Sequence, residues 1–169
     1  MLTWGMPKLT VQTVSFVKSS PKLSRWLILA YEVVAPELPA NVSQALLSVT
    51  ICGDARMCRM NREFRGKDKT TDVLSFPAQQ GVRNKKLSWA APGVLPLGDL
   101  VISLPQARRQ AKQFGVSLEE EMIHLFIHGY LHLLGFDHEL SLKEEKLMLK
   151  HEARLLKKFA EVRKKKKLK

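Results

Sequence analysis

Three histidines in the C-terminal part of the chain have the types and spacing of metal ligands. The run from His128 to His138 has the sequence HGYLHLLGFDH. On a helix, His128 and His132 project from the same face one turn apart, and two imidazoles so placed can take two corners of a tetrahedral zinc ion. Gly135 can adopt a left-handed conformation that reverses the chain and returns His138 as a third ligand. The sequence therefore predicts a site for one Zn²⁺ ion per chain.

The ligand number and spacing indicate the kind of chemistry. Three protein ligands leave one position for water, which is typical of a catalytic zinc site, and the spacing HxxxHxxGxxH is that of the metzincin metalloproteases. In zinc proteases the residue after the first histidine is a glutamate that deprotonates the bound water. Here that residue is Gly129, so the protease base is missing. A substrate phosphate, Asp137 or the lowered pKa of zinc-bound water could compensate.

Other residues near the run have more than one interpretation. Asp137 is either an outer carboxylate that orients an imidazole, which we favour, or a general base. His124 lies four residues before His128, but a ligand pair of these two would lack a glycine at the needed offset before the third ligand. We therefore interpret His124 as a packing or supporting residue, and His151, in a basic terminal segment, as a solvated histidine.

The chain is strongly basic. It has 28 Lys and Arg against 16 Asp and Glu, a formal net charge of +12. Residues 163–169 contribute six positive charges, and like-charged runs of this kind are usually disordered tails. The remainder still carries +6, which suits a polyanionic partner because each neutralised phosphate releases counterions. Charge alone favours a nucleic acid as the partner over an ordinary basic protein.

A second cluster of charges lies in residues 61–77, NREFRGKDKTTDVLSFP. Four cations fall within eight residues of it: Arg62, Arg65, Lys67 and Lys69. Arginine suits phosphate because its planar fork donates two parallel hydrogen bonds. Taken alone, the cluster is either a solvated face or a phosphate-binding site beside the metal.

The remaining patterns predict an α+β fold of mixed α/β layers, in which a four-stranded mixed sheet packs with about five helices. Ser117 and Glu120 form a capping box for the helix that carries the histidines. Residues 79–96 combine Gly, Pro, Asn and Lys and are expected to form a loop. Alternation, prolines and capping residues predict strands at 8–18, 42–52, 71–76 and 97–103, and helices at 21–34, 54–66, 105–115, 117–135 and 142–159.

Length and composition indicate an ordinary globular protein. A chain of 169 residues favours one compact domain. No run approaches the roughly 18 apolar residues of a membrane span, and no secretory signal is evident, so we expect a cytoplasmic location and no membrane partner. The spacing of Cys52 and Cys58 suits neither a CxxC metal site nor a disulfide framework, and we expect both thiols to be reduced.

The two motifs together closely resemble the YbeY family of bacterial rRNA maturation factors. The resemblance rests on residues 61–77, on the segment LGDLVI at 97–102 and on the HGxLHLxGxDH motif at 128–138, in that order. It implies a zincin-like metal-binding core within a single YbeY-like metal-dependent hydrolase domain over residues 1–160. Residues 161–169 are then a basic tail, which we expect to be disordered.

The resemblance also implies a function. Members act as zinc-dependent endoribonucleases that prefer single strands, in 16S rRNA 3′-end maturation and in ribosome quality control. The expected partners are the 16S rRNA precursor and the small ribosomal subunit or its assembly factors. Carried over by position, the zinc ligands are His128, His132 and His138, and the family's functional arginine is Arg65.

A mechanism follows as a hypothesis. Zinc would hold water and polarise a phosphodiester oxygen, while Arg65 stabilises the charge that develops in the transition state. Lys67 and Lys69 are expected to hold the RNA backbone without reading sequence. Two other functions stay open: a non-enzymatic RNA-binding ribosome assembly factor with a structural zinc, and a zincin-type metallopeptidase, which Gly129 and the basic charge disfavour.

Overall fold

The computed structural model describes residues 8–15, 17–18, 20–39, 42, 44–79, 82 and 94–166. All four predicted strands and all five predicted helices are present, and the α+β fold class is confirmed. In chain order the elements are β1 (Lys8–Ser15), α1 (Pro21–Val34), the short 3-10 helix η1 (Ala35–Glu37), β2 (Gln44–Cys52), α2 (Asp54–Arg65), β3 (Val73–Pro77), β4 (Val94–Ser103), α3 (Leu104–Phe114), α4 (Leu118–Leu134) and α5 (Leu142–Lys165).

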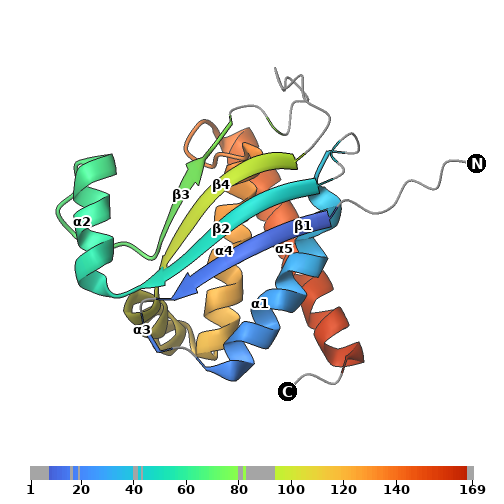
Figure 1. Ribbon diagram of the computed structural model, residues 1–169, viewed down its shortest axis with the longest axis horizontal. Coiled ribbons are helices and arrows are strands. Elements are labelled where there is room, and N and C mark those ends of the chain that lie inside the picture. The colour runs from blue at the N-terminus through green and yellow to red at the C-terminus, as the bar shows by residue number, and fades with distance from the viewer. Residues whose placement is uncertain are drawn as a thin grey trace, which may run out of the picture.

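The four strands form one mixed sheet in the order β1-β2-β4-β3 (Figure 1). Strands β1, β2 and β4 are parallel, whereas β3 pairs antiparallel with β4 at one edge. The β2–β4 register skips Leu97, which is therefore the extra residue of a bulge. At the next residue, Gly98, φ is +126° and a Cβ would overlap the carbonyl oxygen of Phe76. Only glycine therefore allows β3 to lie this close to β4.

Strand β4 begins earlier than the sequence indicated. Its first residue is Val94, inside the segment 79–96 that was expected to be a loop. The prolines in that segment suggested a loop, but Pro96 is exposed in the strand beside the bulge, where the ladder tolerates its missing N–H. Most of the rest of the segment lies outside the described residues.

Helix α4 is the centre of the hydrophobic core. It packs against the sheet and is flanked by α1 and α5, and Figure 1 shows these three helices on one side of the sheet. From residue 121 to residue 134 every α4 side chain is buried except those of His124, His128 and His132. These histidines recur every four residues and so form a single stripe along the helix. The core thus leaves α4 one accessible face, and histidines occupy it.

Helix α2 covers part of the opposite face of the sheet. The side chains of β3 alternate between faces, and Val73 and Ser75 lie against α4. Leu74 therefore points the other way, into a small separate cluster with Cys52, Met57 and Val101. Figure 1 shows α2 apart from the other helices, on the β3 side of the sheet. This packing fixes the end of α2 beside the edge strand.

The final helix is longer than predicted. It was expected to end at residue 159 and to be followed by a disordered tail, but α5 continues to Lys165. The expectation of disorder is therefore wrong for the part of residues 161–169 that the structure describes. The guanidinium of Arg163 lies 4.4 Å from the ring centre of Trp26 and 3.4 Å from a carboxylate oxygen of Glu120. These contacts with α1 and α4 offset the mutual repulsion of the cations.

Other local predictions concern caps and cysteines. Both hydrogen bonds of the Ser117–Glu120 capping box are present, so this prediction is confirmed. Cys52 is buried and Cys58 is half-buried, and both are free thiols, as expected. Among the described residues, no helix is long and apolar enough to cross a membrane.

Candidate metal centre

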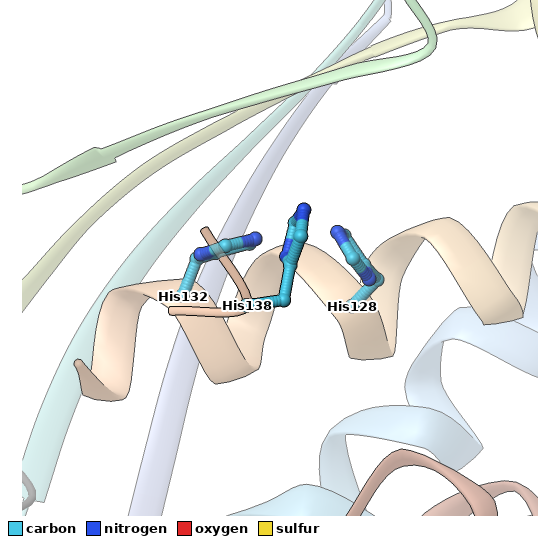
Figure 2. A group of neighbouring side chains, drawn as sticks. All are labelled: His128, His132 and His138. Carbon is cyan, nitrogen blue, oxygen red and sulfur yellow. The ribbon is translucent and has the colours of Figure 1, made fainter. Parts of the chain in front are cut away.

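Helix α4 and the turn after it bring the three predicted ligands together. Gly135 ends the helix with φ +97°, and its N–H and that of Phe136 bond back to carbonyls of the last turn. The chain reverses there, and Figure 2 shows the rings of His128, His132 and His138 converging above the helix. One nitrogen from each ring lies within 4.8 Å of the others.

This ligand set fits a metal ion. Zinc–nitrogen bonds of 2.0–2.1 Å in a tetrahedron place the ligand nitrogens about 3.3 Å apart, and the three observed nitrogens, all within 4.8 Å of one another, lie near this spacing. Among the described residues, these three are the only group of His, Cys, Asp or Glu with such geometry. His124 lies on the same stripe of α4 but is not part of it, as predicted. One face of the site stays open for water or substrate.

The environment of His132 favours the form that binds metal. Burial, and then the neighbouring His128 and His138 rings, lower the pKa of His132 to about 4. The ring is therefore neutral near pH 7, and a neutral imidazole has the lone pair that a metal needs.

A buried carboxylate on α5 supports one ligand. Glu152 is only 6% exposed, and its Oε1 lies 3.2 Å from His128 Nδ1 and 3.1 Å from His124 Nε2. When Nδ1 of His128 donates to this oxygen, Nε2 keeps its lone pair and faces the metal. Burial alone would raise the pKa of Glu152, but the hydrogen bonds from His124 and His128 outweigh it and lower the pKa to about 2. The carboxylate is therefore ionised.

Sequence reasoning missed Glu152. We expected Asp137 to orient an imidazole, but its carboxylate accepts a hydrogen bond from the backbone N–H of Glu139 at 2.9 Å. A signal for Glu152 does exist: it follows Met148 by four residues and precedes Leu155 by three, and both neighbours are buried. An acidic residue on the apolar stripe of an amphipathic helix needs a buried partner.

The interpretation of His151 as a solvated histidine is wrong. Its ring packs on Phe136 with 4.7 Å between centroids, and its Nδ1 lies 3.8 Å from Glu37. The side chain is only 29% exposed. It helps to hold the turn that carries the third ligand, because Phe136 follows the Gly135 reversal directly.

A cleft of about 790 Å³ opens over the three histidines, between β3 and the turn after α4. Arg65 and Asp137, two other site residues expected from the sequence, line it, whereas Lys67 and Lys69 are exposed outside the lining. Segments far apart in the chain thus meet in one cavity. Its lining consists of Arg65, Thr71, Asp72, Val73, Ser75, Pro77, Gln79, His128, His132, Leu133, Gly135, Phe136, Asp137, His138, Glu139 and Leu140.

Arg65 reaches the cleft because α2 ends at this residue. The loop that follows is tied back to the helix by the buried Asn61, whose side-chain amide donates to the carbonyl of Lys69 at 2.8 Å and whose own carbonyl accepts from the N–H of Lys67 at 3.3 Å. Asp72 then accepts from the amide of Gln110 at 2.9 Å. The basic segment is therefore a rigid support for Arg65 rather than a loose surface loop.

Gly129 occupies the position of the glutamate of a zinc protease, and its surroundings are crowded. A Cβ at this position would lie 2.8 Å from Leu100 Cδ2 and 3.2 Å from both Ser75 Oγ and Val73 Cγ2. The hydroxyl of Ser75 also donates to the carbonyl of Gly129 at 3.3 Å. Because α4 packs this tightly against β3 and β4, a glutamate would have to displace all three side chains. The close packing that positions the histidines therefore disfavours the protease base.

The fold and this site define a protein with a zincin-like core, in which one helix and the turn after it present three histidines to an open cleft. Comparison with known proteins places it more narrowly. The family model described as Endoribonuclease YbeY matches residues 12–160. The chain belongs to the YbeY family, which is named for an endoribonuclease, a hydrolase that acts on RNA.

Individual relatives agree with this assignment. The chain is 46% identical over 108 residues to the Endoribonuclease YbeY of Persephonella marina, a match that covers 64% of this chain and 66% of that protein. It is 45% identical over 116 residues to the Endoribonuclease YbeY of Leptospira interrogans, a match that covers 64% of this chain and 82% of that protein. The solution structure of TM1509 from Thermotoga maritima has the same fold, with a TM-score of 0.62 and 24% sequence identity. The match covers 92% of this chain and 93% of that chain.

Proposed function

We propose that the protein is a zinc-dependent endoribonuclease that cleaves single-stranded RNA in 16S rRNA 3′-end maturation and ribosome quality control. Its partners are then the 16S rRNA precursor and the small ribosomal subunit or its assembly factors, in the cytoplasm. Membership of the YbeY family supports the activity. The observation that carries the proposal is that Arg65 and the three histidines line one cleft.

The three histidines would hold the metal, with Glu152 fixing the orientation of His128 through its Nδ1. When bound, zinc supplies a Lewis acid and a water of lowered pKa. An open cleft over three ligands is typical of catalytic zinc, whereas structural zinc sites are closed by four ligands. This distinction argues against an assembly factor in which zinc is only structural.

Arg65 would bind the phosphate to be cleaved. Its guanidinium can donate two parallel hydrogen bonds to phosphate oxygens, and it stabilises the additional negative charge of the transition state without carrying a proton away. Arg65 comes from α2 and the histidines from α4, so the phosphate would lie between two separate elements. Because the 66–72 loop is tied back through Asn61 and Asp72, this position is maintained before substrate binds.

The remaining predicted site residues would act around this centre. Asp137 lines the cleft beside His138, where its carboxylate can accept a proton from an attacking group. Lys67 and Lys69 are exposed outside the cleft lining, so they would contact RNA that extends beyond the cleft, through its phosphates and without reading sequence.

Cleavage by purified protein tests the proposal. We expect the zinc-loaded protein to cut a single-stranded RNA, to spare the same sequence in a duplex and to lose activity when zinc is removed by a chelator and regain it when zinc is restored. Analysis of the new ends identifies the nucleophile, because a 2′,3′-cyclic phosphate excludes water as the first attacking group. Digestion of casein but not RNA by the same preparation would favour a peptidase. RNA binding without any cleavage would favour the assembly factor.

A further inference from the structure

An exposed aromatic pair lies next to the cleft. Phe64, on the last turn of α2, is 57% exposed although it is large and apolar. Its ring packs edge-to-face on that of Phe76 of β3, with 5.0 Å between centroids and 69° between planes. Edge-to-face pairs of this kind hold both rings in a defined orientation. Phe64 is therefore an oriented ring with more than half of its surface in contact with solvent.

The pair stands at the rim of the cleft. Arg65 and Pro77, the residues that directly follow Phe64 and Phe76, both line the cleft, whereas the two phenylalanines do not. Since Ser75 and Pro77 face the cleft, Phe76 faces the other side of β3. Among the residues that the structure describes, β3 is the edge strand of the sheet. An RNA strand that leaves the cleft past Arg65 therefore has only β3 to cross before it reaches Phe64.

The charges around the pair favour nucleic acid as what it contacts. Residues 59–69, the last turns of α2 and the start of the loop after it, carry five cations against two acids, Glu63 and Asp68. Exposed aromatic rings among phosphate-binding cations are the combination with which proteins bind single strands, because bases stack on the rings while the cations follow the backbone. The five cations are Arg59, Arg62, Arg65, Lys67 and Lys69.

We propose that Phe64, held in place by Phe76, is the stacking platform for an RNA base next to the phosphate that Arg65 binds. The inference rests on the proposed function and gives it a physical source of strand preference. An unpaired base is free to stack on the ring, whereas a duplex must first unpair and unstack the base. The platform therefore stabilises bound single strands and leaves the binding of duplexes unchanged.

Substitution of Phe64 tests this with a matched control. Phe114, at the end of α3, is equally exposed, at 59%, but does not line the cleft. The full-length, zinc-loaded protein is titrated into a 2′-O-methyl oligonucleotide containing 2-aminopurine, and its integrity is checked on a gel. Anisotropy of a terminal label gives the dissociation constant, and 2-aminopurine fluorescence falls when that base stacks on a ring.

We expect Phe64→Leu to bind the single strand on the order of 10-fold more weakly and to lose the fluorescence decrease. Phe64→Trp should retain both, and Phe114→Leu should behave as the wild type. Duplex binding should be equal in all four proteins. Because Phe64 is exposed, these substitutions leave the core intact, which thermal unfolding verifies.

Two results would overturn the inference alone. In the first, Phe64→Leu binds the single strand and quenches 2-aminopurine as the wild type does. In the second, Phe64→Leu and Phe114→Leu weaken single-strand binding equally. If the wild-type protein binds no single strand at all, the proposed function fails and the inference fails with it. The wild-type titration thus separates the two failures.

Discussion

Replacing Glu152 by glutamine should weaken zinc binding while leaving the fold in place. The Oε1 of Glu152 lies within hydrogen-bond distance of a predicted ligand, 3.2 Å from His128 Nδ1. Loss of such a partner typically costs 10- to 100-fold in metal affinity, which corresponds to about 1.4–2.8 kcal/mol. Glutamine keeps the shape and can still accept the Nδ1–H, so only the charge is lost.

A charge-assisted hydrogen bond is roughly twice as strong as a neutral one. We therefore expect Glu152→Gln to bind zinc about 10-fold more weakly than the wild type, at the lower end of this range. Glu152→Ala leaves the His124 and His128 rings without this acceptor, and we expect it to bind zinc about 100-fold more weakly. Zinc affinity is measured at pH 7 by competition with a chromophoric chelator. Glu161→Gln is the matched control, because Glu161 is exposed on the same helix.

His124→Ala separates the two hydrogen bonds that Glu152 makes. His124 shares the carboxylate oxygen but is not part of the histidine cluster, so its loss should leave zinc affinity close to that of the wild type. The reasoning is refuted if Glu152→Gln binds zinc as tightly as the wild type, or if Glu161→Gln weakens binding to the same extent. Thermal unfolding of each metal-free variant shows whether a loss of affinity is merely a loss of structure.

Three further predictions concern packing, capping and the terminal helix. Gly129→Ala should lower the free energy of unfolding by up to about 2 kcal/mol, because overpacking against Leu100, Ser75 and Val73 costs about 1–3 kcal/mol and alanine regains about 1 kcal/mol of helix propensity. Denaturant titration measures this difference, and a variant more stable than the wild type would contradict the crowding. Ser117→Ala should cost about 1 kcal/mol at pH 7. Hydrogen bonds from Ser117 lower the pKa of Glu120, so this difference should shrink as pH falls below about 4.5; equal stability at pH 7 would contradict it. Arg163→Ala should reduce the melting temperature slightly, by loss of a contact worth about 0.5–1 kcal/mol, and an unchanged melting temperature would show that the Trp26 contact does not stabilise α5.

The convergence of His128, His132 and His138 could be predicted because their placement is local. Helical periodicity puts His128 and His132 on one face, and Gly135 provides the reversal that returns His138, so no information from elsewhere in the chain is needed. Arg65 is different. Its role came from a resemblance, and only the packing of α2 against the far face of the sheet explains why it meets the histidines.

The features that escaped prediction depend on contacts between distant elements. Glu152 acts across the packed interface of α5 and α4, and nothing in its own helix indicates which residue it meets. The helical end of the basic tail depends on Arg163 contacting Trp26, more than a hundred residues earlier. The crowding at Gly129 follows from side chains on β3 and β4. Each needs the tertiary arrangement, which periodicity and capping do not specify.

We propose that Arg65 and the three-histidine metal site act together on one RNA phosphate. The most direct measurement determines zinc content and single-strand RNA cleavage in the same preparations of wild type, Arg65→Ala and the control Arg108→Ala, an exposed arginine on α3 that does not line the cleft. We predict one zinc per chain in all three proteins, with cleavage about 100-fold or more slower in Arg65→Ala and unchanged in Arg108→Ala. Equal cleavage by wild type and Arg65→Ala, or cleavage that persists after zinc is removed, would contradict the account.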